Sequence, residues 1–173
     1  MEEKSGQNPI LKMGRDGMNF FLKWIFAALV VLFALLQLTN PAFTNPPIKN
    51  DFPVTNAPPR VAALLRAACY DCHSNETRWP WYSHIAPFSW QISKDVNDGR
   101  ENLNFSDWPN DNPIRAAKKM EDMSEEIGYG EMPLKKYTLI HAGARLTKNE
   151  RQALEDWLDA QAARLKSIAA TKN

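Results

Sequence analysis

Hydrophobic residues recur with a helical period along most of the chain, and one segment is apolar on every side. Residues 24–36 are apolar without interruption, and the 19-residue run from 20 to 38 contains a single charge, Lys23. At about 1.5 Å per residue, that run is long enough to cross a hydrocarbon core of about 30 Å. Lys23 can extend its amine to the lipid interface beside Trp24. The pattern predicts a transmembrane helix over residues 20–38.

The charges that flank this helix predict its orientation. Four basic residues lie before it or at its start: Lys4, Lys12, Arg15 and Lys23. The first basic residue after it is Lys49. The positive-inside rule therefore predicts a cytoplasmic leader at residues 1–19 and places the rest of the chain outside. A cleaved signal peptide is the alternative. Because the sequence after the run offers no clean pair of small residues for cleavage, we favour an uncleaved anchor.

Proline marks the next segment. Six of the twelve prolines lie within residues 39–60. Proline-rich chains favour an extended backbone and act as semi-rigid spacers. We therefore expect a linker over residues 39–59, followed by one domain over residues 60–173.

The predicted domain has the periodicity of helices and no strand pattern. Helices are expected near residues 58–73, 87–98, 112–128 and 137–141, the second of them stopped by Gly99. A last helix starts at a capping box formed by Thr147 and Glu150. The expected buried positions are apolar residues at helical spacing: Val61, Leu64, Leu65 and Ala68; Ile114, Ala117, Met120 and Ile127; Leu154, Trp157, Leu158 and Leu165. The predicted fold class is all-α, preceded by one N-terminal transmembrane helix.

Composition excludes one class of partner. The chain carries 21 basic and 20 acidic residues, a formal charge of +1. Nucleic-acid-binding domains usually concentrate positive charge, and no such footprint is visible here. We therefore expect no nucleic-acid partner.

The two cysteines of the chain form the motif Cys69-x-x-Cys72-His73. This is the pattern for covalent attachment of a c-type haem. Two thiols about one helical turn apart can each add to a haem vinyl group, and the next residue is then carried under the ring as an iron ligand. The motif predicts one covalently bound haem c, with His73 as the proximal ligand.

Three other interpretations of the two thiols remain. A thioredoxin-like redox pair needs a βαβ context, and none is visible. A structural disulfide suits an extracytoplasmic compartment but leaves His73 without a role. A zinc site needs a fourth ligand, usually from a second cysteine pair.

An electron-carrying haem usually has a second axial ligand. Met132, in the loop sequence GYGEMP, is the candidate, because Pro133 restricts its backbone to extended conformations. Alternatively, Met132 fills a gap in the core. His84 and His141 are rival ligands, and an open or water-bound iron is the remaining possibility.

The segment after the motif is rich in aromatic residues. Five of them can either wall a porphyrin or form ordinary core: Trp79, Trp81, Tyr82, Phe88 and Trp90. Arg78 and Arg100 are candidate partners for the haem propionates. Lys135 and Lys136 follow the Met132 loop and can mark a docking rim for an acidic partner.

Three segments together resemble a known family. CYDCHSNETRWPWYSHIAPFSW, DGRENLNFSDW and GEMPLKKYTLIHAGARLTKNERQALEDWL occur in the order typical of the bacterial haem-binding domain family of membrane-anchored, cytochrome-c-like proteins. The resemblance covers nearly all of residues 60–165. It implies a cytochrome-c-like helical haem domain, attachment through Cys69 and Cys72, His73 as proximal ligand and a distal role for Met132. The Trp-rich insert departs from class I cytochromes c, whose closing segment the chain otherwise resembles.

These observations lead to one functional hypothesis and two alternatives. The first is a monohaem c-type cytochrome, anchored in the bacterial inner membrane and facing the periplasm, which carries single electrons to redox proteins through transient contacts. Such a carrier is not an enzyme. A haem-based gas or redox sensor, or a peroxidase-like protein, is the alternative if the distal ligand is absent or displaceable. A thiol–disulfide module without haem is the third.

Overall fold

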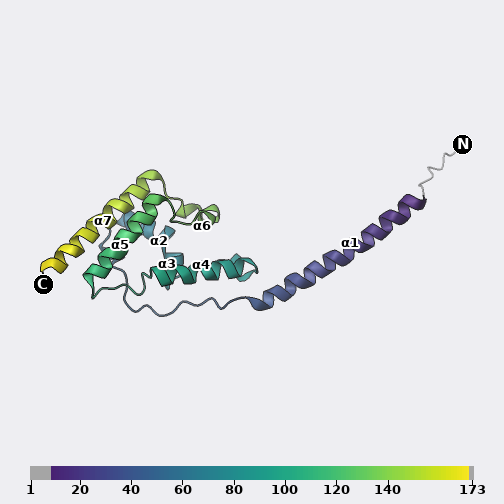
Figure 1. The fold of residues 1–173 in the computed structure, drawn as a ribbon, viewed down its shortest axis with the longest axis horizontal. Coiled ribbons are helices and arrows are strands. Elements are labelled where there is room, and N and C mark those ends of the chain that lie inside the picture. Colours follow the sequence, from purple (N-terminus) through teal and green to yellow (C-terminus); the bar gives the residue numbers. More distant parts are fainter. Residues whose placement is uncertain (1–8, 172–173) are drawn as a thin grey trace. The chain divides into compact units, whose positions relative to one another are not determined.

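The computed structural model describes residues 9–171, which form an all-α fold as predicted (Figure 1). The α-helices are α1 (Pro9–Leu36), α2 (Pro59–Ala68), α3 (Tyr70–His73), α4 (Phe88–Asn102), α5 (Pro113–Tyr129), α6 (Lys135–Ile140) and α7 (Lys148–Thr171). Short 3-10 helices follow α1 at Gln37–Thr39 and lie at Val54–Asn56, Trp81–His84 and Ala142–Ala144. Within the described range, the β-pairing amounts to one isolated bridge, between Asn50 and Asp107.

The described residues divide into two compact units. The first comprises residues 9–41 and 81–90. One stretch, Gly17–Thr39, begins within α1 and ends with the 3-10 helix that follows it; it is long and apolar enough to cross a membrane and is not buried inside the protein. That stretch is compatible with the single-pass anchor predicted over residues 20–38. Residues 1–8 of the predicted cytoplasmic leader lie outside the described residues.

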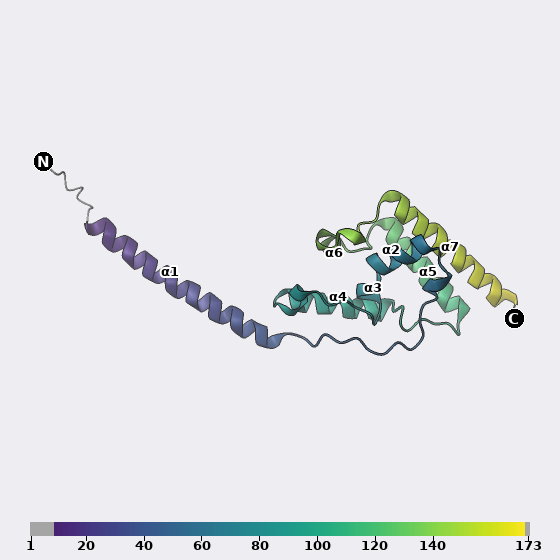
Figure 2. The same cartoon turned by 180° about the vertical axis from the view of Figure 1, so that it is seen from behind.

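The second unit comprises residues 42–80 and 91–171, and its core lies around α5 and α7. Figures 1 and 2 both show α7 lying along α5, with α2 beside them. Leu154 and Leu158 of α7 are fully buried, and α5 contributes Ala117, Met120 and Ile127. The predicted stripes therefore form the core, except that Ile114 is 56% exposed in the first turn of α5.

The ends of these two helices have sequence-encoded caps. The side chain of Asn112 accepts a hydrogen bond from the Arg115 amide at the start of α5, and Gly130 ends that helix with a φ of 76°. At the start of α7, the Glu150 carboxylate accepts from the Thr147 amide and the Thr147 hydroxyl accepts from the Glu150 amide. This is the predicted capping box, which satisfies two amides that have no partner within the helix.

The proline-rich segment is part of the second unit from residue 42 onward, so it does not act only as a spacer. Phe52 and Val54 are 1% and 3% exposed and belong to the hydrophobic core. The Phe52 amide donates to the Phe105 carbonyl over 2.7 Å, and the amides of Lys49 and Asn50 both donate to the Ser106 carbonyl. Proline and apolar residues here bury side chains and pair backbone groups, so the compact unit begins at residue 42 and not at 60.

Two helix boundaries differ from the prediction. The helix expected over residues 58–73 is broken at Cys69, whose backbone (φ −124°, ψ −39°) separates α2 from α3. The helix expected to stop at Gly99 continues to Asn102. Gly99 serves a close approach between segments, because a Cβ atom there would lie 2.6 Å from the Cys72 carbonyl oxygen.

Candidate functional site

The cysteine–histidine motif forms one helical turn. The His73 amide donates to the Cys69 carbonyl over 2.9 Å, and the Cys72 amide approaches the same oxygen at 3.2 Å. This turn places both thiols and the imidazole on the wall of one cavity. The sequence spacing is thus realised as a single, locally hydrogen-bonded arrangement.

The cavity has a volume of about 620 Å³, within the range of pockets that hold cofactors and ligands. Its wall is built from the end of α2, from α3, α4, α5 and α6, and from the chain after α4 and before α6. Apolar side chains, among them Phe105, Met123 and Ile127, line the interior, and Asp95, Lys119 and Lys136 are among the charged lining residues. A mostly apolar wall with a few polar groups suits a large, flat, amphipathic cofactor.

His73 is held in one tautomer by its neighbours. Its Nδ1 atom lies 2.9 Å from the Gly99 carbonyl oxygen and 3.1 Å from the Leu103 carbonyl oxygen. Because a carbonyl oxygen only accepts hydrogen bonds, Nδ1 carries the proton and Nε2 keeps a free lone pair. Burial lowers the pKa of His73, which favours the neutral ring that a metal ligand requires. This hydrogen bonding by the remote nitrogen is typical of metal-ligating histidines.

Both thiols are free and neutral. Burial raises the pKa of Cys69 to about 12 and that of Cys72 to about 11. Reactive thiols of disulfide oxidoreductases have pKa values below the ordinary value of about 8.5. The pKa values of Cys69 and Cys72 are raised instead, which does not favour a thiol–disulfide function. Among the described residues, no three His, Cys, Asp or Glu side chains are grouped so that they could hold a metal ion.

The loop that carries Met132 is fixed from two sides. The amides of Glu131 and Met132 both donate to the Glu126 carbonyl at the end of α5. From α7, one guanidinium nitrogen of Arg151 donates to the Met132 carbonyl at 2.9 Å and to the Ile127 carbonyl at 3.1 Å. Met132 lines the same cavity as His73. The site therefore brings together the four residues that the sequence selected as most important: Cys69, Cys72, His73 and Met132.

The family model of the haem-binding domain matches residues 31–160. The chain belongs to the haem-binding domain family. The match runs from the second half of α1 to α7, so it includes the cavity, the motif and the proline-rich segment. No curated protein and no solved structure matches the chain. Together with the cavity, the membership identifies a haem-binding protein. The residues of this cavity fit that cofactor, since a neutral imidazole with a free Nε2 and two free thiols lie on one apolar wall.

The structure separates Met132 from its predicted rivals. His141 does not line the haem cavity, and His84 belongs to the unit that contains α1. His141 stacks on the ring of Tyr137, with ring centroids 4.1 Å apart. Met123, in contrast, lines the cavity from α5 and is 7% exposed, so a second thioether is available. Nothing in the sequence marks Met123 as an iron ligand, because its position on the apolar stripe of a helix is typical of a residue in the hydrophobic core.

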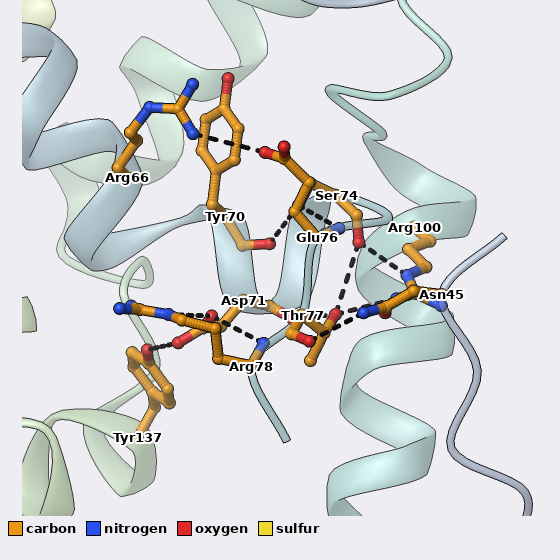
Figure 3. A network of polar contacts seen from close by, with 10 residues as sticks. All are labelled: Asn45, Arg66, Tyr70, Asp71, Ser74, Glu76, Thr77, Arg78, Arg100 and Tyr137. Atoms are coloured by element: carbon orange, nitrogen blue, oxygen red, sulfur yellow. Dashed lines mark hydrogen bonds and ion pairs between the residues drawn. The ribbon is translucent and has the colours of Figure 1, made fainter. Parts of the chain in front are cut away.

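Tyr137 is a second residue that the sequence did not indicate. Its hydroxyl donates to a carboxylate oxygen of Asp71, which is 9% exposed and lies inside the Cys69–His73 motif (Figure 3). Burial, followed by this hydrogen bond, raises the pKa of Tyr137, so the hydroxyl stays protonated. Tyr137 itself lines the haem cavity. The bond therefore ties α6 to the motif. No local sequence pattern reveals it, because the two residues are 66 positions apart.

The predicted propionate partners are engaged elsewhere. Arg78 lies outside the cavity wall, and its amide and Nε both donate to Asp71 (Figure 3). Arg100 donates to Ser74, Thr77, Thr44 and Asn45, and so joins the proline-rich segment to the chain after the motif. Burial lowers the pKa of Arg100. Its role here is to satisfy carbonyl and amide oxygens.

The residues proposed for an aromatic wall are divided between the two units. Trp79 does not line the cavity. Trp79 packs against Phe43, with ring centroids 4.9 Å apart, and its indole N–H is buried without a hydrogen bond. Tyr82 belongs to the unit that contains α1. On the predicted docking rim, Lys136 is paired with Asp95 at 2.8 Å and joins α6 to α4.

Proposed function

We propose that the protein is a membrane-anchored, periplasmic monohaem c-type cytochrome that carries single electrons. The observation that carries the proposal is the one-sided arrangement of Cys69, Cys72 and His73, with the free Nε2 of His73 available on the wall that also contains Met132. When bound, the haem supplies an iron that cycles between two oxidation states.

The two thiols are suited to thioether formation. Each S–H group adds across a vinyl double bond, so that sulfur bonds to one carbon and the hydrogen goes to the other. The addition is redox-neutral and therefore needs reduced thiols, which is the state of both cysteines here. Attachment through both thiols would hold His73 near the haem iron, and the carbonyls of Gly99 and Leu103 orient its imidazole.

Met132 is the proposed distal ligand, and Arg151 is its positioning residue. A thioether and an imidazole as axial ligands raise the reduction potential and are typical of electron-carrying cytochromes. The Met132 amide is hydrogen-bonded to α5 and its carbonyl to Arg151 of α7. The sulfur can therefore keep one position in the oxidised and the reduced protein. Little rearrangement then accompanies transfer of an electron.

The apolar helix α1 and the charges around it support the proposed location. Lys23 and three further basic residues lie before the apolar run of residues 20–38 or at its start, which favours a cytoplasmic N-terminus and a periplasmic haem domain. The proposed partners are redox proteins that meet the haem domain through small, transient interfaces.

An optical experiment on the full chain tests the proposal. The chain is expressed in a host with c-type maturation, purified in detergent and denatured in acid, after which covalent haem stays with the polypeptide. The oxidised protein should show the charge-transfer band of a thioether–iron bond. The band should vanish in Met132→Ala and persist in the matched control Met123→Leu.

The other outcomes assign the alternatives. If Met123→Leu removes the band and Met132→Ala does not, Met123 is the ligand. A high-spin spectrum, with carbon monoxide bound by the reduced parent protein, would instead indicate the sensor or peroxidase-like function. A folded protein that lacks covalent haem would contradict the c-type assignment.

A further inference from the structure

The Trp-rich segment, residues 81–90, is hydrogen-bonded to the residues that directly follow α1. The Gln37 side-chain oxygen accepts from the Ala86 amide over 2.9 Å, and its nitrogen donates to the Ala86 carbonyl over 3.4 Å. Asn40 donates to the His84 carbonyl, and the Trp90 indole donates to the Thr39 carbonyl. Gln37 and Thr39 are among the last residues of the apolar stretch Gly17–Thr39 and Asn40 follows it, so the segment lies where that stretch ends.

In this segment the small side chains are buried and the large apolar ones are exposed. Its small residues Ser83, Ala86 and Ser89 are fully buried. Its large apolar residues are exposed, namely Trp81 at 77%, Phe88 at 63% and Trp90 at 41%. A segment facing water normally buries its aromatic residues and exposes its small polar ones. Clustered exposed aromatic side chains mark a surface that contacts something apolar.

Formal charge is absent from the same region. Residues 24–48 contain no Asp, Glu, Lys or Arg, and neither do residues 79–93. Tryptophan is enriched at membrane–water interfaces, where its ring meets lipid and its N–H meets a polar group. The indole of Trp90 has such a polar partner in the Thr39 carbonyl.

We infer that residues 81–90 form a second membrane-contacting segment, which lies in the interfacial layer of the bilayer beside α1, with Trp81, Phe88 and Trp90 against lipid. The inference rests on the proposed function only in requiring that α1 crosses the membrane. The expected partner is the general phospholipid interface and not an anionic headgroup, because the segment has no Lys or Arg to attract one. Since the chain continues at both ends of the segment into the haem domain, this contact would tether that domain at a second place.

Quenching of tryptophan fluorescence by brominated lipid tests the inference. The full chain is placed in phosphatidylcholine nanodiscs whose acyl chains are brominated either near the headgroup or near the bilayer centre, with unbrominated discs as reference. Because Trp24 of α1 is itself exposed, the test uses the Trp24→Phe chain as its parent. Energy transfer to haem acts equally in all discs and cancels in the ratio.

The Trp24→Phe chain should be quenched by the headgroup-proximal bromine. Adding Trp81→Phe and Trp90→Phe should reduce that quenching by roughly twofold or more, since the interfacial rings are then no longer tryptophan. The control Trp24→Phe/Trp157→Phe should retain it, because Trp157 lies on α7. If the triple variant does not fold, Trp24→Phe/Trp81→Phe gives the same test with the more exposed ring alone.

Equal quenching in the Trp24→Phe chain and in the triple variant would overturn the inference. Failure of the anchor has a different signature. In that case the unsubstituted chain would show no more quenching from either brominated lipid than the Trp24→Phe chain, and alkaline carbonate would release the protein from membranes.

Discussion

The hydroxyl of Tyr137 donates a hydrogen bond of 2.8 Å to the carboxylate of Asp71. Asp71 directly precedes Cys72, the second cysteine of the motif. One end of this bond is on α3 and the other on α6, which follows the Met132 loop. The salt bridge from Lys136 to Asp95 adds a link from α6 to α4. The short helix α6 is thereby connected to two elements of the cavity wall, although none of its own residues is fully buried.

Replacing Tyr137 by phenylalanine should destabilise the haem domain by about 1.5–3 kcal/mol, since it removes a hydrogen bond to a buried carboxylate. Denaturant titration followed by circular dichroism measures the change. Tyr129→Phe is the matched control, because that ring is 77% exposed at the end of α5. Equal stability of the two variants would mean that the Asp71 bond contributes nothing measurable.

Gly99→Ala should destabilise the fold, because the new Cβ atom would lie 2.6 Å from the Cys72 carbonyl oxygen. Overpacking of this kind typically costs about 1–3 kcal/mol. Gly128→Ala is the control: it is also helical, and its Cβ would meet only the Glu155 side chain at 3.6 Å or more. That substitution should stabilise α5 by about 0.5–1 kcal/mol. Thermal unfolding should shift in opposite directions for the two variants.

Phe52→Ala should cost about 3–5 kcal/mol, the usual range for loss of a buried phenylalanine. Phe52 is 1% exposed and packs its ring against Trp108, with centroids 4.5 Å apart. Ile48→Ala, at a side chain that is 48% exposed in the same proline-rich segment, should change stability far less. Chemical denaturation decides whether this segment belongs to the fold. A small effect of Phe52→Ala would restore the interpretation as a free linker.

The haem-free chain should lose stability in acid because of His73. Burial places the pKa of His73 in the folded state below its unfolded value of 6.5. Between these two pKa values the unfolded state therefore binds more protons than the folded state. The contribution of His73 to the free energy of unfolding is therefore complete above pH 6.5 and is lost as the pH falls through the folded pKa. The free energy changes by at most about 1.4 kcal/mol per pH unit. Denaturant titrations at several pH values should show a shallower dependence for His73→Gln. Both chains retain the other two histidines, so the difference reports His73.

Arg151→Gln should weaken the proposed Met132–iron bond without touching either partner. The substitution removes the guanidinium that donates to the Met132 and Ile127 carbonyls. In the haem-loaded protein, imidazole should displace the distal ligand roughly tenfold more readily, which corresponds to about 1.4 kcal/mol. Arg164→Gln makes the same charge change at an exposed position of α7 and should leave the displacement curve unchanged. Identical curves would remove Arg151 as a positioning residue.

The sequence determined what local rules can encode. The apolar stretch that ends at Thr39, the caps of α5 and α7 and their buried stripes follow from residue type and spacing alone. The motif Cys69–His73 likewise needs only one helical turn to place its thiols and imidazole on one side. Met132 was selected as a candidate because a Met-Pro pair in a loop is a local pattern.

Only the tertiary structure decided which distant residues meet. The Gly99 carbonyl holds His73, Tyr137 donates to Asp71, and Phe52 enters the core from a segment whose prolines favoured a spacer. The aromatic run after the motif is compatible by composition with a haem wall, but its exposed rings lie in the unit that contains α1. Residue spacing predicts helices because their hydrogen bonds are local. Contacts between residues tens of positions apart depend on how whole elements pack, which no local pattern records.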